Sequence, residues 1–187
     1  GGMKAENGLK VAAVVTELPK KSYYPIGKIV DVLGKPGENE TEMHAILAQF
    51  DLPYRFEEAV SNAANEISDV IDQKEIDKRR DYRGVTTFTI DPSDAKDYDD
   101  ALSVQQLENG NWEIGVHIAD VTHYVTPNSI VDKEAYYRAT SVYLVDRTVP
   151  MLPENLSNKL CSLRPNEDKL CFSVIFEMDH KAKIISK

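Results

Sequence analysis

The sequence predicts an α+β fold, and three features of its pattern lead to that prediction. Near the start, residues 9–18 and 26–33 are valine-rich apolar runs of strand length. Between residues 39 and 71, apolar side chains recur every three or four positions, as they do in amphipathic helices. From residue 85 onward, β-branched and alternating runs return between turn residues. The chain therefore places strands on both sides of a helical stretch.

The first elements are predicted to be a small β-module followed by helices. Residues 19–25 begin and end with proline and connect the two apolar runs as a loop. After turn residues at 35–38, Asn39 and Glu42 form an N-cap pair that predicts the start of a short helix. Residues 56–71 predict an amphipathic helix of about four turns, which we expect to link two domains.

The second half of the chain is predicted to begin with three strands. Residues 85–90 are a β-branched run that indicates a strand ending at Asp91. Residues 101–107 and 112–120 predict two further strands, joined by a hairpin at the Asn-Gly pair 109–110. The acidic residues that follow Asp91 therefore begin at the end of a strand.

The register of this hairpin decides which acidic side chains meet. If Asn109 and Gly110 alone form the turn, Asp99 lies opposite Asp120, and a sixth carboxylate comes near the acidic residues. A bulge would break that register.

The last elements are predicted from shorter patterns. Residues 132–139 indicate a helix, and residues 151–156 a short helical or irregular segment. Residues 170–178 alternate as a half-buried strand does. Residues 182–187 indicate the start of another strand, so we expect the natural chain to continue beyond them.

Composition indicates an ordinary globular protein, with 42% apolar and 28% charged residues. No apolar run approaches the roughly 20 residues that span a bilayer, so we expect a soluble, cytoplasmic protein without membrane contact. Cys161 and Cys171 show neither disulfide nor zinc spacing and are expected to be reduced thiols. Acids interleave with the basic run between Lys74 and Arg83, which is read as a solvated helix face.

The net charge of −9 argues at first against a nucleic-acid partner, but its distribution is uneven. Residues 91–100 hold five aspartates and one lysine, a net charge of −4. Carboxylates so close together repel one another, and a bound divalent cation would offset that repulsion. Magnesium takes oxygen ligands and suits phosphodiester hydrolysis.

The spacing of the acidic segment can be compared with two other structures, a calcium-binding loop and a solvated acidic turn. A helix-loop-helix calcium loop needs a ligand at position 5, glycine at 6 and glutamate at 12, where Ala95, Lys96 and Leu102 stand here. That loop is excluded. A solvated acidic turn fits the spacing as well as a metal site does, and spacing alone leaves both open.

Several motifs resemble the ribonuclease II/R family, whose catalytic domain is the RNB domain. Residues 89–92 (Thr-Ile-Asp-Pro) and 97–101 (Asp-Tyr-Asp-Asp-Ala) match its signature, and residues 115–125 follow at the expected place. Residues 140–144, 150–157 and 160–165 extend the resemblance. Residues 25–30 (Pro-Ile-Gly-Lys-Ile-Val) are similar to the close of the second cold-shock domain in the ribonuclease R branch.

The resemblance implies a site. Asp91, Asp97, Asp99 and Asp100 match the family's active-site aspartates, which bind magnesium, or manganese in its place, and position the attacking water. Asp99 and Asp100 are the expected catalytic residues. Tyr143 matches an aromatic side chain that stacks on an RNA base near the 3' end. Asp120 is a candidate for supporting these aspartates from beside them, on the hairpin register alone.

Spacing cannot decide the role of the two histidines beside Asp120. His117 and His123 are expected to be packed side chains without a catalytic role, because an isolated strand histidine is usually packed.

The resemblance also implies the architecture: a partial OB-type β-barrel followed by part of a mixed α/β RNB catalytic domain. We expect residues 1–50 to end a cold-shock domain, 51–84 to be a helical linker, and 85–187 to begin the catalytic domain. The implied activity is 3'-to-5' hydrolysis of single-stranded or structured RNA to nucleoside 5'-monophosphates.

The family's later catalytic arginines and glutamate lie outside these residues, so the chain alone is expected to be inactive. The alternative function is a non-catalytic, cold-shock-like RNA-binding module with an acidic surface.

Overall fold

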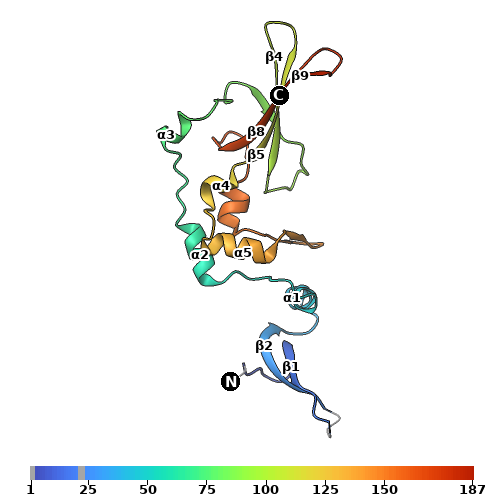
Figure 1. The fold of residues 1–187 in the computed structure, drawn as a ribbon. Helices are drawn as coiled ribbons and strands as arrows, with labels where there is room; N and C mark the ends of the chain where they lie inside the picture. Colours follow the sequence, from blue (N-terminus) through green and yellow to red (C-terminus); the bar gives the residue numbers. More distant parts are fainter. Residues whose placement is uncertain (1–2, 21–23) are drawn as a thin grey trace. The chain divides into compact units, whose positions relative to one another are not determined.

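The computed structural model describes residues 3–20 and 24–187, and they divide into two compact units (Figure 1). Unit 1 is Gly1–Phe56 and unit 2 is Glu57–Lys187. Within the described ranges, no helix has both the length and the apolar character needed to cross a membrane.

Unit 1 contains an antiparallel strand pair and one helix. The strands are β1 (Lys10–Glu17) and β2 (Ile26–Gly34), and the helix is α1 (Asn39–Gln49). Both predicted strands are confirmed, while the predicted connecting loop lies partly outside the described residues, at 21–23. Leu33 of β2 packs into the small core with Leu47 of α1, which is fully buried.

The start of α1 differs slightly from the prediction. The N-cap residue is Glu38, one position before Asn39. Glu42 does not complete a capping box, because its carboxylate accepts hydrogen bonds from the Gly37 amide at 2.9 Å and from Lys10 Nζ at 2.6 Å. Glu42 therefore ties the turn before α1 to strand β1.

Unit 2 is built on a five-stranded antiparallel sheet with the order β3-β4-β5-β8-β9; strands β4, β5, β8 and β9 are labelled in Figure 1. Its strands are β3 (Thr86–Phe88), β4 (Asp100–Gln106), β5 (Trp112–Ala119), β8 (Cys171–Met178) and β9 (Ile184–Ser186). A separate pair is formed by β6 (Val142–Tyr143) and β7 (Thr148–Val149). The sheet places the acidic segment between neighbouring strands β3 and β4.

The helices of unit 2 are short. They are α2 (Glu58–Asn65), α3 (Gln73–Ile76), α4 (Val121–Tyr124), α5 (Ile130–Arg138) and the π-helix η1 (Leu156–Leu160). Helices α2 and α5 pack together, and Val60, Val131 and Leu156 are buried. The helix predicted at 132–139 is confirmed, with Ser129 Oγ accepting a hydrogen bond from the Asp132 amide.

The long helix predicted at 56–71 is wrong in length. Helix α2 ends at Asn65, and the chain then turns at Ser68, whose Oγ accepts a hydrogen bond from the Val70 amide at 3.1 Å. Val70 is 77% exposed, so the apolar repeat that suggested one helix does not lie on one buried face. A new short helix, α3, starts behind the N-cap Asp72.

The predicted hairpin register is wrong by one residue. The Leu107 amide donates to the Asn111 carbonyl, so three residues, 108–110, form the turn, and Gly110 takes a φ of +83°. Asp99 therefore pairs with Ala119, whose amide donates to the Asp99 carbonyl at 3.0 Å. Because a slip of one residue reverses side-chain direction, Asp120 does not face Asp99 across the hairpin.

The two faces of the sheet differ in character. On one face, His117 is 3% exposed and its ring nitrogens lie 2.8 Å from Ser103 Oγ and 2.7 Å from Ser173 Oγ. The opposite face carries apolar side chains that are 43 to 73% exposed: Phe88, Ile118, Phe172 and Val174. His117 is packed as predicted, whereas His123 is exposed.

Candidate active site

The acidic segment is a loop that leaves one strand and enters the next. Asp91 lies just beyond β3, and Asp100 is the first residue of β4. Because β3 and β4 are antiparallel neighbours that pair at Phe88 and Leu102, the two ends of the loop lie at the same edge of the sheet. The sheet thus returns the last aspartates toward the first.

Hydrogen bonds from the end of η1 hold the second half of this loop. Ser162 Oγ donates to the Lys96 carbonyl at 2.8 Å and accepts from the Tyr98 amide at 3.0 Å. The Leu163 amide donates to the Tyr98 carbonyl at 2.8 Å. With the bond between Asp99 and Ala119, residues 96–99 have a defined path.

Electrostatics identify which aspartates lie together. Restricted hydration raises the pKa of the Asp99 carboxyl, and the negative charges of Asp97, Asp100 and Asp91 raise it further. Asp94 is exposed and is not among the carboxylates that act on Asp99. Asp99 therefore lies within electrostatic reach of Asp91, Asp97 and Asp100, and these four residues are here called the aspartate cluster.

Among the residues that the structure describes, no ion pair balances the charge of the aspartate cluster. In the part of the chain that the structure describes, no lysine, arginine or histidine forms an ion pair with any member. Asp91, Asp99 and Asp100 are exposed, so a cation and a substrate phosphate could both reach them. This donor set fits magnesium, which takes carboxylate oxygens while keeping waters and substrate phosphates as ligands.

The carboxylates are nevertheless not arranged as a closed metal cage. Across residues 3–20 and 24–187, no three acidic, histidine or cysteine side chains converge tightly enough to hold an ion on their own. Magnesium usually takes only one or two protein carboxylates and completes its shell with waters and substrate phosphates. The arrangement fits an open site that shares its ion with substrate.

Tyr143 lies beside the aspartate cluster. It belongs to β6, is 67% exposed, and its hydroxyl donates a hydrogen bond to Asp97 Oδ2 at 3.0 Å. That hydrogen bond, together with burial and the charge of Asp99, raises the pKa of the Tyr143 hydroxyl. The ring of Tyr143 is thus held at the acidic site while most of its surface remains open to a ligand.

Asp120 belongs to a different group of charges. Its carboxylate accepts a hydrogen bond from Arg79 at 2.7 Å and one from Thr122 at 2.6 Å. Burial raises the pKa of Asp120, but the hydrogen bonds from Thr122 and Arg79 outweigh it and lower the pKa. Asp120 therefore has its counter-charge within the chain.

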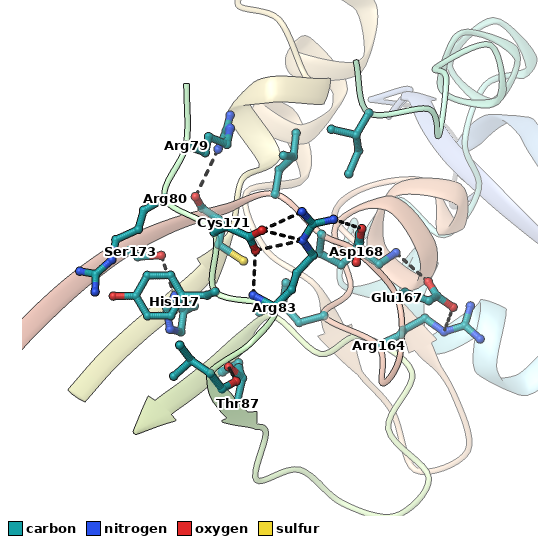
Figure 2. Close-up of a pocket in the computed structure, with 18 of the residues that line it drawn as sticks. Arg79, Arg80, Arg83, Thr87, His117, Arg164, Glu167, Asp168, Cys171 and Ser173 are labelled. Atoms are coloured by element: carbon teal, nitrogen blue, oxygen red, sulfur yellow. Dashed lines mark hydrogen bonds and ion pairs between the residues drawn. The ribbon is translucent and has the colours of Figure 1, made fainter. Parts of the chain in front are cut away.

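A hollow of about 1100 Å³ opens beside the acidic loop (Figure 2). Thr89 and Leu163 line it, but among the described residues no member of the aspartate cluster does. Its arginines already have partners: Arg83 pairs with Asp168 at 3.1 Å and Arg164 with Glu167 at 3.5 Å. The hollow thus lacks the unbalanced charge that marks the loop.

Sequence reasoning missed the roles of two residues. Ser162 fell within the recognised segment 160–165, but a lone serine carries no signal for a contact with a loop 64 residues away. Arg79 was read as part of a solvated helix face, and that reading is wrong. It is half-buried, and it binds Glu75, Asp120 and the Cys171 carbonyl.

Comparison with family models agrees with this architecture. The RNB domain model matches residues 79–187, and the cold shock domain model matches residues 1–57. These matches confirm the resemblance read from the motifs and the order of an OB-type module followed by part of an RNB domain. Among the described residues, the OB-type module consists of a two-stranded sheet and not a closed barrel.

Individual relatives are much longer than this chain. Ribonuclease R 1 of Lactococcus lactis is 43% identical over 187 residues, which are 99% of this chain and 23% of that protein. The structure of Mycoplasma genitalium RNase R in complex with double-stranded RNA is 32% identical, with a TM-score of 0.87 over 96% of this chain and 32% of that one. Yeast Ssd1, a pseudonuclease, is 25% identical, with a TM-score of 0.70 over 93% of this chain and 22% of that one.

Proposed function

Because the chain belongs to the RNB family, we propose that it supplies the metal-binding part of a 3'-to-5' hydrolytic exoribonuclease that releases nucleoside 5'-monophosphates from RNA. The observation that carries this proposal is the aspartate cluster. Asp91, Asp97 and Asp100 lie within electrostatic reach of Asp99 at one edge of the sheet, and no ion pair among the described residues offsets their charge.

The cluster residues would hold magnesium, or manganese in its place. A bound ion of this kind supplies Lewis-acid stabilisation of the scissile phosphate and lowers the pKa of an attacking water. All four aspartates would serve as ligands of the ion. Asp99 and Asp100 would in addition orient the attacking water and accept its proton.

RNA is the proposed substrate, in single-stranded or structured form. The exposed ring of Tyr143 would stack on a base near the 3' end, while its hydroxyl stays on Asp97. Stacking uses the face of the ring and reads no base edge, so hydrolysis would proceed through any sequence. The Mycoplasma relative bound to double-stranded RNA supports the same substrate class.

The 187 residues alone are proposed to have little or no hydrolytic activity. The chain spans only 23% of Ribonuclease R 1. One face of the five-stranded sheet also leaves Ile118 46% and Phe172 73% exposed, which is unusual for side chains of this size in the middle of a sheet. Efficient degradation of labelled RNA by the purified chain would contradict this part of the proposal.

The second candidate function is a non-catalytic RNA-binding module. A specific observation favours it: yeast Ssd1, a pseudonuclease, shares the fold with a TM-score of 0.70, so the fold alone does not establish hydrolysis. The two candidates differ in whether the aspartate cluster performs chemistry.

Substitution of Asp99 separates these two functions. In a full-length protein that contains these residues, Asp99→Asn should reduce RNA hydrolysis at least about a hundredfold while leaving RNA binding intact, because it removes a charge at the reacting centre. Asp94→Asn is the matched control, since it makes the same change in the same loop outside the cluster. Hydrolysis that is unchanged in Asp99→Asn would exclude the catalytic assignment.

Metal binding can be tested in the chain itself. Titration with Mn²⁺, followed by electron paramagnetic resonance, should show binding that Asp99→Asn weakens and Asp94→Asn does not. Equal Mn²⁺ binding in both variants would place the ion elsewhere.

We also propose a cytoplasmic location, which the free thiols of Cys161 and Cys171 support.

A further inference from the structure

We infer that Ser162 is a positioning residue for the aspartate cluster: its hydroxyl fixes the backbone on both sides of Asp97 and thereby sets where the metal ligands lie. This inference rests on the proposed function of the cluster as a metal site. It concerns an uncharged residue whose side-chain hydrogen bonds go to the neighbours of Asp97, Lys96 and Tyr98.

The geometry of the contact is specific. Ser162 is fully buried, and its hydroxyl forms two hydrogen bonds with the loop: it donates to the Lys96 carbonyl and accepts from the Tyr98 amide. The two loop groups belong to the residues immediately before and after Asp97. The Leu163 amide adds a third bond, to the Tyr98 carbonyl, so one short turn holds the loop by three hydrogen bonds.

The loop needs such an external support because it has little regular structure of its own. Before Asp97, the loop contains a turn that is closed by a hydrogen bond from the Ala95 amide to the Pro92 carbonyl. The loop joins the hydrogen-bonded sheet only at Asp99. Repulsion among the carboxylates would widen an unsupported loop. A buried hydroxyl that bonds the backbone opposes this widening without adding a charge to the site.

The turn that carries Ser162 is itself firmly placed. It follows η1, a π-helix whose Leu156 and Leu160 are 0% and 5% exposed. Short π-helical segments inside proteins are often found near functional sites. Here the segment runs from the buried core of unit 2 to the loop and places Ser162 against it. The position of the metal ligands therefore depends on the packing of residues that are distant in sequence.

Ser162→Ala removes the hydroxyl and both of its hydrogen bonds. We expect the Tyr98 amide to exchange with solvent at least about tenfold faster, measured by nuclear magnetic resonance on the 187-residue chain. We also expect Mn²⁺ affinity to fall by about tenfold, in the range seen when the partners of metal ligands are removed. Both measurements are made at a temperature where the variant is fully folded.

Ser103→Ala is the matched control. Ser103 is 2% exposed and its hydroxyl also makes a buried hydrogen bond, but its partner is His117 in β5 and not the loop. The substitution should lower stability by a comparable amount while leaving Tyr98 exchange and Mn²⁺ affinity unchanged. If Ser162→Ala does not fold, Ser162→Cys keeps the size of the side chain and weakens its hydrogen bonds, and the same changes are expected.

The outcomes separate the inference from the proposed function. Unchanged Tyr98 exchange or unchanged Mn²⁺ affinity in Ser162→Ala would overturn the positioning role, as would equal effects in Ser103→Ala, which indicate general destabilisation. If wild type and Asp99→Asn bind Mn²⁺ equally, the metal site itself is wrong. Exchange at Tyr98 still reports on the Ser162 contact in that case.

Discussion

The acidic loop and the acidic group around Arg79 lie in the same unit and differ in what balances their charge. In the loop, Asp99 faces other carboxylates, and these charges raise its pKa. Around Arg79, the guanidinium bonds both Asp120 and Glu75 at 2.7 Å, and each of these carboxyls has a lowered pKa. The acids around Arg79 have ion-pair partners, whereas among the described residues the aspartate cluster has none.

This difference separates carboxylates that are paired with an arginine from carboxylates that are open to a cation. A carboxylate that already has an arginine partner gains little from a cation, whereas a group of unpaired carboxylates is stabilised by one. Net charge alone would not have separated them, because Asp120 follows Asp100 by only 20 positions. Substitutions that change one of these groups at a time should affect stability most at Arg79 and least at Tyr143.

Removal of Arg79 should have the largest effect. Arg79→Ala leaves Asp120 and Glu75, which are 11% and 19% exposed, without their shared partner. We expect a loss of about 2 to 3 kcal/mol in the free energy of unfolding, measured with denaturant, because the part-buried charge of Asp120 loses its ion-pair partner, while Glu75 keeps Lys78 at 3.1 Å. Arg80→Ala is the control, since its partner Glu113 keeps hydrogen bonds from Tyr82 and Gln105. A loss in Arg79→Ala no larger than in the control would contradict the comparison.

Asp120→Asn should have a smaller effect that depends on pH. The pKa of Asp120 is lowered in the folded state, so its contribution is fully present above the unfolded-state value of about 3.9 and is lost as pH falls through the folded-state pKa. At pH 7 we expect the variant to be about 1 to 2 kcal/mol less stable than wild type. Thermal unfolding at a series of pH values should show the two proteins converging below pH about 4. A difference that stays constant with pH would refute the ion pair.

Much of the fold could be predicted because the pattern of the strands is local. The strands β1, β2, β4, β5 and β8 all lie where apolar runs or alternation predicted them. The hairpin turn was located but its length was not, because Asn-Gly fits both a two-residue turn and a three-residue turn with Gly110 at positive φ. That one residue decided the partner of Asp99.

The site was predictable to the extent that it is written in one stretch of sequence. The aspartate cluster spans residues 91–100, so one motif names all four of its members, and their role as metal ligands stays a prediction. The contact of Ser162 with the acidic loop and the contact of Arg79 with Asp120 were not predictable, because tertiary packing joins residues that are 64 and 41 positions apart. Serine and arginine occur too often on surfaces for their position alone to indicate such a role.

Asp99→Asn should change stability in the opposite direction to Asp120→Asn. Its carboxyl has a raised pKa, so the charged form opposes folding above that pKa, and neutralisation relieves the repulsion. In the metal-free chain we expect a gain of about 0.5 kcal/mol at pH 7, within the range of partly exposed substitutions. Mn²⁺ should reverse the order, since it would stabilise wild type more than the variant. A loss of stability in metal-free Asp99→Asn would show that the repulsion is compensated.

Tyr143→Phe should have the smallest effect on stability and tests whether the two functions of this side chain separate. The substitution removes the hydroxyl that bonds Asp97 and keeps the ring. Because Tyr143 is 67% exposed, we expect the free energy of unfolding to change by less than about 0.5 kcal/mol. RNA affinity should be retained, since stacking needs only the ring, whereas Tyr143→Ala should weaken it by about tenfold. Equal RNA binding by the two variants would exclude Tyr143 as a stacking platform and leave its hydrogen bond to Asp97 as its only contribution to the site.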